Sequence, residues 1–129
     1  MLRVVASLSV GCAVLLALGC GSDKPKLVTV TGKVVFKNEP LTAGSIWFVP
    51  DLGNAYQGEK PSCQLQLDGS FTMRTYPFGD GVPPGAYKVM LSPELANRIK
   101  KPEYGDAAKT PLTLTVPDVG VRDHVIDVK

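Results

Sequence analysis

Hydrophobic and polar residues alternate with a period of two along most of the chain after residue 27. Such alternation is typical of β-strands with one buried face, and no long stretch repeats apolar residues at helical spacing. A long connection at residues 92–111 has room for one helical turn near residues 94–99. The pattern predicts an antiparallel β-sandwich of seven short strands separated by turns. The predicted strands cover residues 28–36, 45–49, 63–67, 70–75, 87–91, 112–116 and 122–128.

The alternation also predicts which side chains face the core. Residues 45–49 are apolar on both faces of their strand, so we expect both faces to be covered. Cys63, Leu65 and Leu67 share one face of the next strand and are expected to lie inside. Residues 68–69 (Asp-Gly) tolerate the positive φ of a tight hairpin turn and predict one at this position.

The N-terminal residues follow a different pattern. One positive charge, at Arg3, precedes an uncharged and mainly apolar stretch at residues 4–18. A positive end, an apolar core of about 7–15 residues and a small residue at the cut define a secretory signal peptide. The stretch is only a little shorter than the roughly 20 apolar residues of a membrane-spanning helix, so an uncleaved anchor is an alternative. We predict a signal peptide at residues 1–19.

The end of this segment, residues 16–20 (LALGC), resembles the lipobox of bacterial lipoproteins, in which a cysteine after a small residue is diacylated and becomes the first residue. Ala17 and Leu18 stand in the reverse of the order that this family prefers. The resemblance implies a lipid on Cys20 and a tether at residues 20–27. Two or three acyl chains give durable attachment to a membrane. Gly21 and Ser22 carry no acidic retention cue after the cysteine, so we expect the protein at the outer membrane or the periplasmic face of the cell envelope. Simple secretion is the other alternative.

Composition limits the rest of the chain to one ordinary domain. Removal of residues 1–19 leaves 110 residues, enough for a single core, which we place at residues 28–129. These 110 residues carry 13 Lys and Arg against 12 Asp and Glu, and no basic patch interleaved with aromatics indicates a nucleic-acid partner. Cys63 is then the one cysteine without lipid, so no internal disulfide is expected.

Several motifs of this domain resemble carboxypeptidase-regulatory-like domains. Residues 30–34 (VTGKV) and 40–44 (PLTAG) are similar to their opening, residues 68–71 (DGSF) to a hairpin, and residues 83–89 (PPGAYKV) to the entry to a strand. Residues 101–113 resemble the end of this domain in small bacterial lipoproteins. The resemblance implies a prealbumin-like (transthyretin-like), Greek-key-type sandwich after the N-terminal signal helix. It implies no catalytic residues, because these domains are accessory or structural where they are understood.

The residues themselves offer one nucleophile and one base for catalysis, Cys63 and His124. Both fall on strand positions that face the core, so we interpret them as packed side chains. The alternatives are a reactive thiol at Cys63 and a ligand or pH sensor at His124. Structural zinc usually requires four Cys or His ligands. We therefore predict no enzymatic activity, no metal and no cofactor.

The first hypothesis for function is a non-catalytic, lipid-anchored envelope protein that is structural or that binds a protein or a glycan. Its partners are then membrane lipid, through Cys20, and an envelope protein or glycan. Tyr76, Phe78 and Tyr104 either line such a binding surface or pack over the open ends of the sandwich.

The alternative hypothesis is a module that binds a small ligand or a metal ion through two loops. These loops are residues 51–60 and 78–82, which are polar or rich in glycine. Asp51, Tyr56 and Asp80 are the candidate ligand-binding residues, because carboxylates suit calcium and an exposed tyrosine suits a sugar or peptide. Tyr56, between two small or polar neighbours, is expected to be the most exposed aromatic residue.

Overall fold

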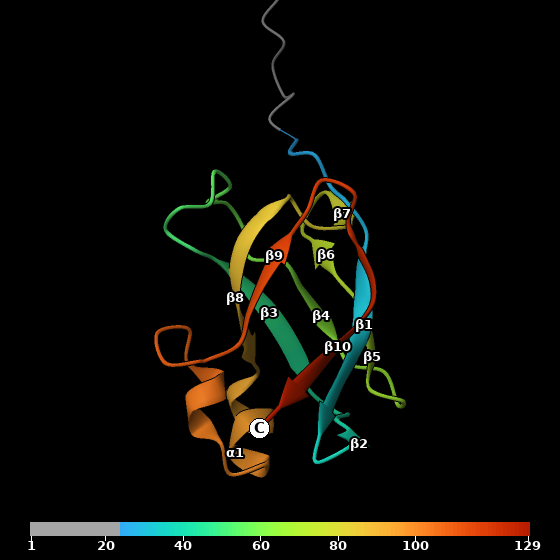
Figure 1. Ribbon diagram of the computed structural model, residues 1–129, viewed down its shortest axis with the longest axis vertical. Helices are drawn as coiled ribbons and strands as arrows, with labels where there is room; N and C mark the ends of the chain where they lie inside the picture. Colours follow the sequence, from blue (N-terminus) through green and yellow to red (C-terminus); the bar gives the residue numbers. More distant parts are fainter. Residues whose placement is uncertain (1–23) are drawn as a thin grey trace, which may run out of the picture.

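The chain folds into two β-sheets that pack against each other, with two short helices at one end (Figure 1). The structure is a computed structural model that describes residues 24–129. The all-β sandwich predicted from the sequence is confirmed. The first sheet contains β1 (Val30–Phe36), β2 (Glu39–Pro40), β5 (Ser70–Thr72) and β10 (Val121–Val128). The second contains, in spatial order, β7 (Gly79–Asp80), β6 (Arg74–Thr75), β4 (Ser62–Gln64), β3 (Ser45–Pro50), β8 (Gly85–Leu91) and β9 (Thr113–Val116).

The hydrophobic core lies between the two sheets and is built from every second residue of the longer strands. In β8, Tyr87, Val89 and Leu91 are buried, and in β1 Val30 and Val34 are buried. Each large apolar side chain of this kind contributes about 1.5–3 kcal/mol when it leaves water. The core is therefore the main source of stability for the described domain.

The pairing of β1 with β10 differs from the predicted antiparallel arrangement, because these two strands run parallel. Gly32 lies opposite His124, and the register shifts between Val30 and Gly32. Near this shift Asp123 has a left-handed backbone conformation, with φ of 55°. A Cβ atom at Gly32 would lie 1.8 Å from the carbonyl oxygen of His124, so this close approach of the first and last strands requires glycine.

Residues 70–75, predicted as one strand, belong to both sheets. β5 pairs with β1 in the first sheet, whereas β6 pairs with β4 and β7 in the second. At the crossing point the N–H of Met73 donates to the carbonyl of Val30 at 3.0 Å, and the carbonyl of Met73 accepts from the N–H of Gly81 at 2.8 Å. The predicted tight turn before β5 is confirmed at Gly69, whose φ is 81°.

The connection between β8 and β9 contains α1 (Pro93–Arg98) and the 3-10 helix η1 (Pro102–Gly105). The predicted helical turn in this region is thus confirmed. Leu95 of α1 is fully buried and covers one end of the core. Tyr104 of η1 is also buried, and its hydroxyl donates to the carbonyl of Lys129 at 2.7 Å. Of the two interpretations of Tyr104, packing over the sandwich is the correct one.

Three predictions about buried faces are wrong. Cys63, expected to lie inside, is only half-buried. Leu67 is 94% exposed, because β4 ends at Gln64 and the chain has already entered a turn at Leu67. Trp47 and Val49, on the outer face of β3, are only half-buried, and Trp47 lines an open surface pocket. The side chain of Leu65, directly after β4, is buried as predicted. The alternation of buried and exposed side chains therefore ends between Leu65 and Leu67.

The described residues begin after the segment predicted to direct export. The signal peptide at residues 1–19, the lipid on Cys20 and the first part of the tether lie outside them. Within residues 24–129, no helix combines the length and the apolar character needed to cross a membrane.

Candidate functional site

The loop at residues 51–60 is held in place by Asn54, a buried polar residue. Its side-chain nitrogen donates to the carbonyl of Ala86 at 2.8 Å, and its side-chain oxygen accepts from the N–H of Tyr56 at 2.9 Å. The side chain of Gln57 donates to two further loop carbonyls, each at 2.8 Å. These bonds fix the loop against the start of β8, so its polar groups are largely occupied by the loop itself.

Tyr56 is half-buried and packs against the core, so the expectation that it is the most exposed aromatic residue is wrong. Its hydroxyl donates to the carbonyl of Glu59, and its ring lies against Gly58, where a Cβ atom would come within 2.8 Å of it. Burial, followed by the negative charge of Glu59, raises the pKa of Tyr56. Tyr56 therefore anchors the loop, and its ligand-binding role stays a prediction.

Asp51 and Asp80 lie in different parts of the second sheet. Asp51 follows β3 and Asp80 ends β7, with β4 and β6 between these strands. Three strand spacings of about 4.8 Å place these strands roughly 14 Å apart across the sheet, and Asp51 lies four residues beyond Trp47, with which Asp80 is in register, so the two carboxylates are farther apart still. The Nε atom of Arg74 lies 3.1 Å from the Oδ1 atom of Asp80, and the Oδ1 atom of Asp51 accepts from the N–H of Leu52 at 3.0 Å. Among residues 24–129, no three His, Cys, Asp or Glu side chains are grouped to hold a metal ion.

The loop predicted at residues 78–82 is open only in part. Val82 is fully buried and forms two backbone hydrogen bonds with Val28, of 2.8 and 2.9 Å. Phe78 and Tyr76, in the turn between β6 and β7, are exposed. Unlike Tyr104, Tyr76 does not pack over the end of the sandwich. Its side chain is available to an external surface.

Cys63 and His124 do not form a nucleophile–base pair. They belong to different sheets, since Cys63 is in β4 and His124 in β10. The thiol of Cys63 contacts the backbone of Thr72 in β5, and two strand spacings, about 10 Å, separate β5 from β10. Burial raises the pKa of Cys63 to about 11, although the hydrogen bond with Thr72 opposes this shift. A thiol with this pKa is a poor nucleophile at neutral pH.

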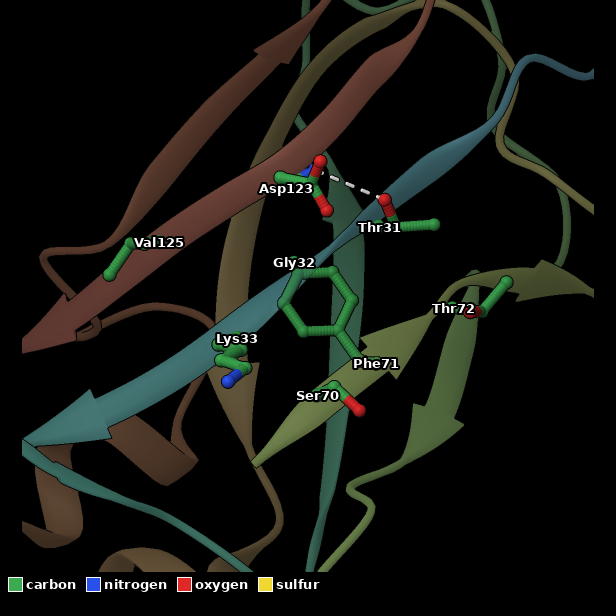
Figure 2. Close-up of a pocket in the computed structure, with 8 residues that line it drawn as sticks. All are labelled: Thr31, Gly32, Lys33, Ser70, Phe71, Thr72, Asp123 and Val125. Carbon is green, nitrogen blue, oxygen red and sulfur yellow. Dashed lines mark hydrogen bonds between the residues drawn. The ribbon is translucent and has the colours of Figure 1, made fainter. Parts of the chain in front are cut away.

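A groove of about 360 Å³ lies on the outer face of the first sheet, over β1 and between β5 and β10 (Figure 2). The N–H of Asp123 donates to the hydroxyl of Thr31 at 3.1 Å across the groove. Small-molecule pockets are mostly apolar and enclose their ligand. This groove is open and exposes polar and apolar surface in similar proportions, so it suits a segment of a larger partner better than an enclosed small molecule. The lining residues are Thr31, Gly32, Lys33, Ser70, Phe71, Thr72, Asp123 and Val125.

The sequence analysis did not identify this groove, although part of its signal was visible. The alternation of β1 places Thr31 and Lys33 on the face away from the core, as the structure has them. The groove forms because β5 and β10 pair with opposite edges of β1. The pairing of β10 with β1 is parallel, and the sequence analysis did not predict it. The irregular backbone at Asp123 has no local sequence signal of the kind that glycine gives at a turn.

Comparisons of the chain with family models, with curated proteins and with solved structures find no match. The fold and the groove define a class, an all-β sandwich domain with an open groove on one sheet. The resemblance to carboxypeptidase-regulatory-like domains stays a prediction from the sequence motifs.

Proposed function

We propose that this protein is a non-catalytic, lipid-anchored protein of the bacterial cell envelope whose sandwich domain binds another envelope protein. The observation that carries the anchor is the sequence of residues 16–20, where Cys20 ends the apolar stretch behind Arg3. Only nine residues separate Cys20 from β1, which begins at Val30. A lipid on Cys20 holds the sandwich domain close to the membrane.

The arrangement of the candidate catalytic residues supports a non-catalytic role. A covalent mechanism requires a nucleophile and a base within hydrogen-bond reach of each other. Cys63 and His124 lie in different sheets, and the raised pKa of the thiol disfavours the reactive thiolate at neutral pH. The resemblance to carboxypeptidase-regulatory-like domains supports the same proposal, since those domains are accessory or structural.

The groove favours a protein as the partner over a glycan. Its hydroxyl groups, the ammonium group of Lys33 and the carboxylate of Asp123 suit the polar and charged groups of a peptide segment. Val125, which is 58% exposed, offers an apolar contact at its edge. The one aromatic residue of the groove, Phe71, is 2% exposed and presents no ring face on which a sugar could stack. The loops around Asp51 and Asp80 are a weaker candidate for a binding site, because the two loops lie far from each other.

Replacement of Cys20 tests the anchor. In Cys20→Ala, we expect the protein to leave the membrane fraction after a high-salt wash, because the acyl chains supply nearly all the membrane affinity. A variant that still sediments with washed membranes contradicts the lipid anchor and favours the uncleaved helix.

Site-specific crosslinking in intact cells tests the partner. A photoreactive amino acid at Val125, in the groove, should capture one defined protein. The matched control is the same amino acid at Thr115, an exposed residue of β9 in the other sheet. Capture of the same protein from both positions, or of none from Val125, contradicts the role of the groove.

A further inference from the structure

Three loops lie at the end of the sandwich where the N-terminal segment enters the fold (Figure 1). The β9–β10 turn lies against Thr29, because a Cβ atom at Gly120 would come within 2.5 Å of the Thr29 carbonyl oxygen. Gly81, after the β6–β7 turn, lies against Val28, because a Cβ atom at Gly81 would be 3.0 Å from the Val28 carbonyl oxygen. The β3–β4 loop reaches this end through Asn54, which bonds the first residues of β8. We call this end the N-terminal pole, formed by residues 51–60, 76–78 and 117–120.

Each of the three loops exposes a large apolar side chain. Leu52 is 96% exposed in the β3–β4 loop, Tyr76 is 77% exposed in the β6–β7 turn, and Val119 is 88% exposed in the β9–β10 turn. Phe78 lies two residues from Tyr76 and is also exposed. Turns are usually built from Gly, Pro, Asn, Asp and Ser, so turn chemistry does not require these residues. Within residues 24–129, the other large apolar side chains of comparable exposure are Leu67 and Val125.

The three tips are held in fixed conformations. The N–H of Leu52 donates to the Oδ1 atom of Asp51 at 3.0 Å, and the N–H of Phe78 donates to the carbonyl of Thr75 at 2.7 Å. In the β9–β10 turn, the N–H of Gly120 donates to the carbonyl of Pro117 at 2.9 Å. Because the backbone of each turn is already hydrogen-bonded, a partner does not have to offset the entropy of ordering that backbone.

The arrangement of the tips selects the kind of surface that fits them. A protein partner usually requires a continuous apolar patch, whereas these tips stand on separate loops. A lipid bilayer is broad enough to contact all of them at once. If Cys20 carries lipid, the eight residue-to-residue steps from Cys20 to Val28 span at most about 28 Å, which keeps the N-terminal pole near that bilayer.

We propose that the N-terminal pole docks on the membrane that holds Cys20, with Leu52, Tyr76 and Val119 inserted among the lipid headgroups. Tyrosine suits this depth, because its ring is apolar and its hydroxyl remains in contact with water. The carboxylates of Asp51 and Asp118 lie beside the tips and limit the insertion to the interface. This docking fixes the orientation of the domain, and it rests on the proposed lipid on Cys20.

Fluorescent labels at the tips test the docking on the lipidated full-length product. The protein is purified in detergent and returned to vesicles of phosphatidylethanolamine and phosphatidylglycerol. An environment-sensitive dye is attached through Leu52→Cys or Val119→Cys, each in a Cys63→Ala background. The matched control is Leu67→Cys, which is 94% exposed in the turn before β5, at the far end of the same sandwich. We expect a blue shift and quenching by spin-labelled lipid at both tips, and neither change at Leu67.

The outcomes separate this inference from the proposed function. Protein that floats with the vesicles but shows no quenching at Leu52 or Val119, or equal quenching at Leu67, overturns the docking and leaves the lipid anchor intact. A blue shift that depends on protein concentration instead of lipid indicates contact with a second copy and also overturns it. Failure of the membrane-extracted protein to carry lipid and to float overturns both proposals.

Discussion

Replacing Gly32 with alanine should disrupt the pairing of the first and last strands. The added Cβ atom would lie 1.8 Å from the carbonyl oxygen and 2.8 Å from the carbonyl carbon of His124. Real Cβ atoms do not approach other heavy atoms more closely than 3.0 Å, so β10 must move away from β1 by more than an ångström. The ring of Phe71, 2.9 Å from the same position, blocks the opposite movement.

The expected destabilisation follows from the nature of this obstacle. Overpacking a core typically costs about 1–3 kcal/mol, because side chains and backbone shift to make room. At Gly32 the nearest atoms belong to a paired backbone, which cannot rotate away, so we expect a loss of about 3 kcal/mol or more in the free energy of unfolding. For a domain of this size, such a loss lowers the melting temperature by roughly 12 °C or more.

Urea and thermal unfolding of a soluble form that begins at Lys24 measure this loss, with the fluorescence of the half-buried Trp47 as the signal. The matched control is Gly53→Ala, since a Cβ atom there meets no heavy atom within 4 Å. We expect this control to change the stability by no more than about 0.5 kcal/mol. If Gly32→Ala and Gly53→Ala unfold within about 1 kcal/mol of each other, the close pairing of β1 with β10 is refuted.

Three further measurements, on two variants and on the native protein, test the packing around the candidate residues. Asn54→Ala removes the two hydrogen bonds of the Asn54 side chain and should cost about 1–3 kcal/mol in urea unfolding; an unchanged midpoint contradicts the anchoring. Native Cys63, with its pKa raised to about 11, should react with a thiol reagent at pH 8 roughly a hundredfold more slowly than in the unfolded chain, and rapid labelling contradicts its burial. Cys63→Ala should lower stability by about 1–2 kcal/mol without loss of partner capture at Val125, and lost capture with intact folding contradicts a packing role.

The features predicted correctly from the sequence depend on neighbouring residues in the chain. The side chains of Tyr87, Val89 and Leu91 face the core because alternation within one strand decides which face is buried. The turn at Gly69 forms because Asp and Gly tolerate the required backbone conformation. The helical turn near Leu95 likewise follows from local preferences within the long connection.

The features that were predicted wrongly depend on partners far away in the sequence. Alternation does not say which strand lies beside β1, so the parallel pairing with β10 was not predicted. Met73 lies where the chain passes from one sheet to the other, and its hydrogen-bond partners are Val30 and Gly81. Leu67 continues the apolar–polar alternation of the sequence, but it lies beyond the end of β4 at Gln64.

The candidate site was predicted less well than the fold for the same reason. Asn54 and Tyr56 lie in a polar loop whose composition predicts exposure, yet Asn54 is bonded to Ala86 at the start of β8 and Tyr56 is bonded to Asn54. The groove is formed by three strands, and its position depends on their order in the sheet. A site that is assembled across strands has no signal in any one segment of the sequence.

Mass spectrometry of the N-terminal peptide is the most direct test of the lipid anchor. The protein is extracted for this purpose from the membranes of the cells that produce it. We predict a peptide that begins at Cys20 and carries a diacylglyceryl group on its sulfur, with the preceding residues 1–19 removed. A membrane-bound chain that retains residues 1–19, or one that begins after them without lipid on Cys20, would contradict the proposal.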